Sequence, residues 1–350
     1  MPFGLNSAMV LILSAASLLA QADDPGGPCN EYLKTPLPAE AAAIETPKTW
    51  PDCNSYKLYS GIGTKVDFDA ARKCAWKERL AIQAGLEPKY TVASIVGGSA
   101  MLAVLYANGE GVEQSKPLAL RFACEAEVSP PGLKDIEALP EQAHLATKKF
   151  RYCDEAYTTF EMNYCAAYDA EIAAQKRRDA MDSLSRNWPP EHLGAFKALE
   201  DAEEKYVEAH GRGEVYQGGT IRNLRTNGVE ERQRDKFLAA VQEFESGHLP
   251  KGTVGDFKKA DAELHAIYQK AMKLAAVPKE YDDGFSKPDG IRSAERAWLR
   301  YRDAWVEFAK LHYPGTDSNA WLTLLTTNRI SSLRATACDV GWDDRACKHE

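Results

Sequence analysis

Residues 291–308 read IRSAERAWLRYRDAWVEF and carry the strongest structural signal in the chain. The large apolar side chains of this stretch recur at intervals of three and four residues: Ile291, Ala294, Trp298, Tyr301, Trp305 and Phe308. This spacing places them along one face of an α-helix, so it predicts a long helix whose aromatic face packs against neighbouring helices. We expect these rings to form core, and the alternative is an exposed aromatic strip that binds a partner.

A second helical stripe precedes this stretch and belongs to an internal duplication. The stripe consists of Leu264, Ile267, Tyr268, Ala271 and Leu274. Asp169-Ala-Glu-Ile-Ala-Ala recurs 92 residues later as Asp261-Ala-Glu-Leu-His-Ala, and the segments beginning at Leu199 and Ile291 are similar at the same offset. Similarity at one fixed offset indicates a repeated structural unit. The sequence therefore predicts two related antiparallel helical units, 153–250 and 251–337, each built as helix, long helix and helix.

Upstream of the duplication, residues 100–126 read AMLAVLYANGEGVEQSKPLALRFACEA. Two apolar helices are expected on either side of Asn-Gly-Glu-Gly, where Gly109 and Gly111 allow a tight reversal between antiparallel helices. Together with the stretch 66–76, this segment resembles the Sel-one type of tetratricopeptide-like repeat. We therefore predict helical-hairpin repeats over 61–127. The Val-Ser-Pro-Pro-Gly stretch then predicts a linker over 128–152. The expected fold class is all-α.

The first 22 residues have the pattern of a secretory signal. They carry no charged side chain, and they contain an apolar run from Ala8 to Ala20 that ends in Leu-Ala-Gln-Ala before Asp23. This run is too short to span a bilayer and has the length of a signal h-region, followed by a small-residue cleavage site. We expect residues 1–22 to be removed, and no later segment is long and apolar enough to span a membrane. The predicted location is periplasmic or secreted.

All eight cysteines follow the expected signal, which favours disulfides in an exported protein. No Cys-x-x-Cys pair occurs, so a zinc cluster or thioredoxin-like chemistry is poorly supported. Because the cysteines fall in sequence-local pairs, the expected bonds are Cys29–Cys53, Cys74–Cys124, Cys153–Cys165 and Cys338–Cys347. The Cys- and Pro-rich residues 23–60 are expected to be a disulfide-tied N-terminal segment, and residues 338–350 a Cys-containing tail.

Composition and motifs exclude several function classes. Acidic residues outnumber basic ones by 51 to 43, which gives a formal charge of −8 and argues against nucleic-acid binding. The seven histidines are scattered without close pairs, so we expect no metal and no other cofactor. No Gly-x-Ser-x-Gly, His-Glu-x-x-His or P-loop pattern occurs. The chain is therefore not expected to be an enzyme.

Several motifs together resemble the LprI-type lysozyme inhibitor family. The resemblance covers about residues 153–335 and rests on Met-Asn-x-Cys, Ala-Trp-x-x-Tyr-Arg-Asp and Thr-x-x-Arg elements. The matching positions are Met162, Asn163, Asp261, Leu264, Tyr268, Trp298, Tyr301, Arg302, Asp303, Thr326 and Arg329. It implies an exported, helical bacterial protein associated with lysozyme inhibition. We interpret Arg302 and Asp303 as residues that specify the fold, because a buried arginine needs an ionic partner.

Charge patterning suggests where a partner binds. Glu200, Glu204 and Glu208 are spaced four residues apart, and their counterparts in the second unit are Arg292, Arg296 and Arg300. Like charges at this spacing repel each other by about 0.2 to 0.5 kcal/mol per pair, and a partner of opposite sign relieves the repulsion. The two rows can pair with each other, the acidic row can face a basic protein, or both can remain solvated. We assign the acidic row tentatively to partner binding.

These observations predict an exported cell-envelope protein that binds a basic protein, with lysozyme as the candidate partner. One alternative is an envelope scaffold that uses its helical repeats to bind a peptide or another envelope protein. A second alternative is an enzyme that acts on peptidoglycan.

Overall fold

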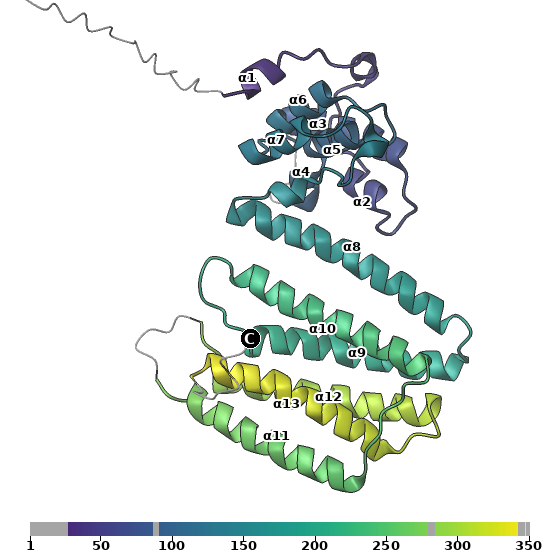
Figure 1. Cartoon of the computed structure of the whole chain (residues 1–350), viewed down its shortest axis with the longest axis vertical. Coiled ribbons are helices and arrows are strands. Elements are labelled where there is room, and N and C mark those ends of the chain that lie inside the picture. The colour runs from purple at the N-terminus through teal and green to yellow at the C-terminus, as the bar shows by residue number, and fades with distance from the viewer. Residues whose placement is uncertain (1–26, 87–90, 279–283, 342–346, 348–350) are drawn as a thin grey trace, which may run out of the picture.

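The computed structural model describes residues 27–86, 91–278, 284–341 and 347. These residues form α-helices and short 3-10 helices, without a β-strand, so the predicted all-α class is confirmed. The expected signal peptide, residues 1–22, lies outside the described residues. The helices pack into two bodies with separate hydrophobic cores, one built mainly from residues before 160 and one from residues after 180 (Figure 1).

The N-terminal body contains seven short helices around one aromatic core. They are α1 (Cys29–Tyr32), α2 (Ser55–Ser60), α3 (Phe68–Gln83), α4 (Val92–Val96), α5 (Gly98–Asn108), α6 (Lys116–Glu125) and α7 (Pro130–Glu137). The predicted hairpin is present as α5 and α6, which pack against each other. Gly109 and Gly111 adopt φ of 64° and 66°, and a Cβ on Gly111 would meet the backbone of Phe68 at 2.7 Å. Glycine is therefore required at this reversal.

The stretch 128–152, predicted as a linker, is instead part of the N-terminal body. Its Pro-Pro-Gly begins α7, because proline is tolerated in the first helical turn and the Ser129 hydroxyl accepts the N–H of Gly132 as an N-cap. Leu133, Ile136 and Phe150 from this stretch are buried in the N-terminal core. The prolines thus start a helix here and do not mark a domain boundary.

Two of the four expected disulfides are wrong. Cys29 bonds to Cys124 and Cys53 to Cys74, in place of Cys29–Cys53 and Cys74–Cys124. The reason is packing: α1 lies against α6, which carries Cys124, whereas Cys53 precedes α2, which lies against α3 and its Cys74. The other two expected pairs, Cys153–Cys165 and Cys338–Cys347, are present.

Peptide mapping without reduction tests this connectivity. We expect digestion of the oxidised protein to release a peptide pair that joins the Cys29 and Cys124 segments, because these segments are held side by side by α1 and α6. A linked pair of the Cys29 and Cys53 segments would contradict the structure. Mapping after reduction and alkylation is the control.

The C-terminal body contains six long helices in two three-helix units. The first unit is α8 (Thr159–Ser185), α9 (Pro190–Gly213) and α10 (Arg222–Glu245), and the second is α11 (Val254–Ala275), α12 (Pro288–His312) and α13 (Ser318–Asp339). Residues related by the 92-residue offset lie on corresponding helices of the two units. In each unit the third helix packs against the first and the second, while α9 and α12 pack along each other between the units (Figure 1).

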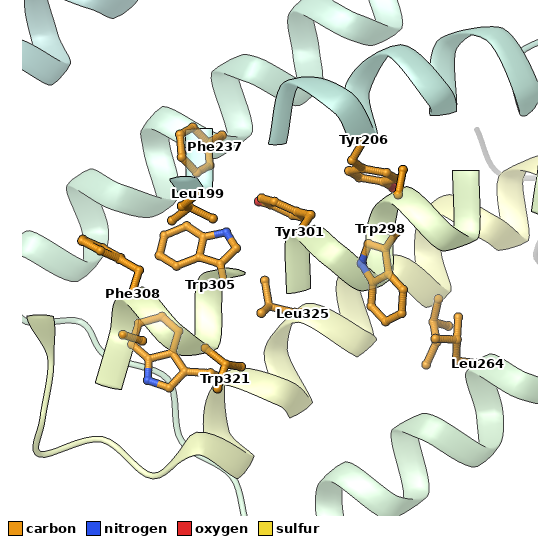
Figure 2. Packing of buried hydrophobic residues seen from close by; sticks show 14 of the residues in the cluster. Leu199, Tyr206, Phe237, Leu264, Trp298, Tyr301, Trp305, Phe308, Trp321 and Leu325 are labelled. Atoms are coloured by element: carbon orange, nitrogen blue, oxygen red, sulfur yellow. The ribbon is translucent and has the colours of Figure 1, made fainter. Parts of the chain in front are cut away.

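The α9–α12 pair forms the centre of the second core. Its helices are antiparallel, because His192 meets His312 at one end and Gly213 meets Gly290 at the other. The whole stripe from Ile291 to Phe308 is buried, with exposed fractions of 7% or less, so these rings form core and not an exposed strip. Figure 2 shows Tyr301 and Trp305 of α12 among side chains of the helices that surround it.

Helix α8 connects the two bodies. Its first half contributes Cys165 and Tyr168 to the N-terminal core, and near its other end Met181 belongs to the C-terminal core. The Tyr168 hydroxyl lies 2.5 Å from that of Ser60. One continuous helix thus belongs to both bodies, although the sequence-based boundary assigned it to the first repeat unit alone.

Candidate functional site

A cleft of about 820 Å³ lies between α10 and α13, above the α9–α12 pair. Its base is formed largely by aromatic side chains: Tyr206, Phe237, Phe244, Trp298, Tyr301 and Trp305. The α10 wall carries three cations, Arg225, Arg232 and Lys236, which we call the rim cations. The α13 wall carries the polar side chains Asn328, Ser331 and Ser332 together with Leu324, Leu325 and the carboxylate of Asp339. A cavity of this size between helices, with an apolar base and a few polar groups, has the general form of a ligand site.

A buried ion-pair network lies at one end of this cleft. The guanidinium of Arg329 on α13 donates to both carboxylate oxygens of Glu214, the residue that follows α9, at 2.6 and 2.7 Å. Its Nε donates to Glu295 of α12 at 3.0 Å. Arg329 and Glu214 are only 1% and 2% exposed. One arginine thus joins the three helices that surround the base of the cleft.

The electrostatics of the network follow from burial and from this pairing. Burial alone would raise the pKa of Glu214, but the Arg329 guanidinium and a hydrogen bond with His210 hold that pKa at about 2. Burial raises the pKa of Glu295, and Arg329 opposes that effect only in part. The bidentate geometry suits arginine and not lysine, because only a planar guanidinium donates two parallel bonds to one carboxylate. With its charges internally paired, the network serves to hold the helices in place.

The predicted acidic row lies on α9 and does not pair with the arginines of the second unit. Glu204 accepts two bonds from Arg234 of α10, at 2.7 and 3.0 Å. Glu208 pairs with Arg212 of its own helix at 3.4 Å. In the second unit Arg292 pairs with Asp289. Of the three explanations for the two rows, mutual pairing is therefore wrong.

Helix α10 adds further negative charge beside this row. Glu230 and Glu231 share Arg234 with Glu204, so one guanidinium serves three carboxylates. Burial raises the pKa of Glu230, Arg234 opposes this, and the nearby Glu204 and Glu208 carboxylates raise it further. The face formed by Glu200, Glu204, Glu208, Glu230 and Glu231 is called here the acidic face. Its five carboxylates outnumber the three arginines that pair with them, Arg177, Arg212 and Arg234.

The second helical unit is similar to a known protein family. Residues 253–333 match the family described as Lysozyme inhibitor LprI. The match covers α11 and α12 and most of α13. No curated protein and no solved structure matches the chain. The family model does not include the Sel-one-like segment or residues 153–252, so the resemblance of those regions stays a prediction.

Residues 253–333, called here the LprI segment, contain most of the signature residues. These residues differ in how far their side chains are buried. Leu264, Trp298, Tyr301, Thr326 and Arg329 are buried, Tyr268 is half-buried and Asp261 is exposed. Met162 and Asn163 lie outside the segment, half-buried in the first turns of α8. Trp298, Tyr301 and Arg329 of this set line the cleft between α10 and α13, and the other signature residues lie outside it.

Arg302 and Asp303, interpreted from the sequence as residues that specify the fold, pair with each other and not with a facing helix. Arg302 donates to its neighbour Asp303 at 2.8 and 3.0 Å and lies over the ring of Trp298. The buried arginine that joins helices is Arg329 of Thr-x-x-Arg, and its partners Glu214 and Glu295 were missed. Tyr216-x-Gly218 follows α9, and the similar Tyr313-x-Gly315 follows α12. This similarity does not indicate that Glu214 or Glu295 is buried.

Glu203 of α9 is a second buried carboxyl that sequence reasoning missed. It is 5% exposed, and its Oε1 has no hydrogen-bond partner within the described residues. Burial, with a further contribution from Glu204 and against the opposing effect of Arg234, raises its pKa to about 7. The carboxyl is therefore largely protonated below neutral pH.

This pKa predicts a pH-dependent stability. Because the folded pKa lies above that of the unfolded chain, the stabilising effect of the proton is complete below about pH 4.5 and is lost as the pH rises through 7. Glu203→Gln should raise the free energy of unfolding at pH 8 by about 2 to 3 kcal/mol and flatten its pH dependence, as measured by urea titration. The exposed Glu113→Gln is the control. An unchanged pH profile in Glu203→Gln would contradict the assignment.

The described residues were compared with the requirements of a metal site and of a membrane-spanning helix. Across residues 27–86, 91–278 and 284–341, no group of three or more His, Cys, Asp or Glu side chains is arranged to hold a metal ion. In the same part of the chain, no helix combines the length and the apolar character needed to cross a membrane.

Proposed function

We propose that this chain is an exported cell-envelope protein that inhibits a lysozyme by binding it. The observation that carries the proposal is the match of residues 253–333 to the lysozyme inhibitor LprI family. The match supports a binding function and not a catalytic one, because the family is named for inhibition.

The covalent chemistry of the chain supports an extracytoplasmic location. Eight cysteines form four disulfides, and such bonds persist in oxidising compartments. The signal-like pattern of residues 1–22 supports the same location. An exported inhibitor would meet a lysozyme in the periplasm or outside the cell.

The acidic face supports a cationic partner. Its five carboxylates lie on adjacent helices of the first unit, and Arg177, Arg212 and Arg234 together offset part of their charge. The chain as a whole carries a formal charge of −8. Complementary charge accelerates association and weakens with added salt, so we expect binding of a basic lysozyme to be salt-sensitive.

Inhibition assays on variants of the acidic row test this surface. We expect Glu200→Gln/Glu204→Gln/Glu208→Gln to weaken inhibition of lysozyme about tenfold at low salt, because three charges that attract the partner are removed. The free energy of unfolding should change by less than about 1 kcal/mol, since the broken Glu204–Arg234 pair is partly exposed.

The matched control removes three carboxylates from the N-terminal body. Glu45, Asp52 and Glu113 are exposed there, and their Gln or Asn variants change the net charge by the same amount. Equal loss of inhibition in both variants would show a general charge effect and would contradict docking at the acidic face. Inhibition that is unaffected by either variant would place the contact elsewhere on the chain.

A further inference from the structure

We propose that the cleft between α10 and α13 binds an amphiphilic carboxylate, with its apolar chain on the aromatic base and its head group at the rim cations. This site is separate from the acidic face, and its charge is opposite. A cationic lysozyme would be repelled by the rim cations, so we do not expect lysozyme to bind in this cleft.

The shape of the cleft follows from the helix packing. Helix α10 packs against α8 and α9, and α13 packs against α11 and α12. The third helices of the two units therefore stand on either side of the central pair and leave the cleft of about 820 Å³ between them. Pockets of about 300 to 1,000 Å³ bury most of a small organic molecule.

The base of the cleft suits an apolar chain. Phe237 and Phe244 from α10 and Trp305 from α12 line the cleft and form edge-on ring contacts of 5.5 to 5.7 Å with one another, so this part of the lining is aromatic. Figure 2 shows Phe237, Tyr301 and Trp305 grouped beside Tyr206. An alkyl chain that lies against the exposed edges of these rings would itself be removed from water, which favours binding.

The rim supplies the charge that selects the head group. Arg225 donates to the backbone carbonyls of Tyr216 and Gly218 and lies over the Tyr216 ring. Within the described part of the chain, neither it nor Arg232 nor Lys236 forms an ion pair with a carboxylate. Arg234, on the same helix but outside the cleft lining, pairs with three.

This contrast is what points to an anionic ligand. Acidic residues exceed basic ones in the chain, and yet Arg232 and Lys236, one helical turn apart on α10, have no carboxylate partner in the described part of the chain, and neither does Arg225 farther along the same wall. The facing wall offers Asn328, Ser331 and Ser332, whose side chains can donate hydrogen bonds to a carboxylate, and it carries one acid, Asp339, at the end of α13. A head group held between these walls would receive both charge and hydrogen bonds.

Titration of the mature, oxidised protein with dodecanoate tests the proposal, with tryptophan fluorescence as the signal because Trp298 and Trp305 line the cleft. We expect a saturable change with dodecanoate, and binding weaker by about tenfold or more for uncharged dodecanol and for acetate, which lack the head group or the chain. Inorganic phosphate should not compete. Equal binding of dodecanol and dodecanoate would overturn the role of the rim cations, and the absence of saturable binding would overturn the site.

Variants assign the binding to this cleft. Arg232→Gln/Lys236→Gln should weaken dodecanoate binding about tenfold and leave dodecanol unchanged, because only the charged contact is removed. Lys258 and Lys259 are exposed on α11. Lys258→Gln/Lys259→Gln removes the same charge away from the cleft and should have no effect on binding. Ala335→Phe, which places a ring in the cleft from α13, should weaken binding of both ligands. Equal losses in the first two variants, or full binding in Ala335→Phe with its melting temperature retained, would contradict the proposal.

Discussion

Replacing Arg329 with alanine is expected to lower the free energy of unfolding by about 3 to 5 kcal/mol at pH 7, because it leaves buried carboxylates without their counter-ion. Glu214 would lose both of its bonds to the guanidinium, and Glu295 would lose the bond from Nε. The pKa of Glu214, held at about 2 by this pair against the effect of burial, should then rise. The loss of stability should therefore be larger at pH 7 than at pH 4, where the carboxyl becomes protonated.

A double variant separates the missing charge from the missing packing. Glu214→Leu/Arg329→Met replaces the buried pair with apolar side chains, and such replacements are often close to neutral. We expect it to recover a substantial part of the stability lost in Arg329→Ala, as measured by urea unfolding at pH 7. A double variant as unstable as the single one would show that packing, and not the unpaired carboxylate, dominates the loss.

Trp305→Ala is expected to cost about 3 to 5 kcal/mol through the cavity that it leaves in the core. Trp305 is 1% exposed, and its ring lies against Phe237, Phe308 and Trp321 (Figure 2). It also contacts Phe244. Because these neighbours come from α10, α12 and α13, the cavity should weaken the packing between the two helical units.

The control for this variant lies on the same helix. Leu299→Ala removes a side chain that is 37% exposed, so it should cost clearly less than Trp305→Ala. A Trp305 variant that keeps its melting temperature would contradict the assignment of this ring to the core.

The helices and their buried faces follow from local sequence, which is why they were predictable. The three- and four-residue spacing from Ile291 to Phe308 determines one face of α12, and all six of these residues are buried. Gly109 and Gly111 mark the α5–α6 reversal, because positive φ is unfavourable for other residues.

Features that depend on how distant helices meet were not predictable in this way. The Cys29–Cys124 bond joins segments 95 residues apart, and it follows from the packing of α1 against α6. The partners of Arg329 lie on α12 and at the end of α9, and the spacing of Thr-x-x-Arg does not point to either of them. The cleft likewise exists only because α10 and α13 flank the α9–α12 pair.

The most direct test of the proposed function is a calorimetric titration of lysozyme with the mature, oxidised chain, with residual lysozyme activity measured in parallel. We expect saturable binding, loss of lysozyme activity in proportion to the complex formed, and weaker binding as salt is added. A chain that is folded and fully oxidised, and that neither binds lysozyme nor reduces its activity at low salt, would contradict the proposed function.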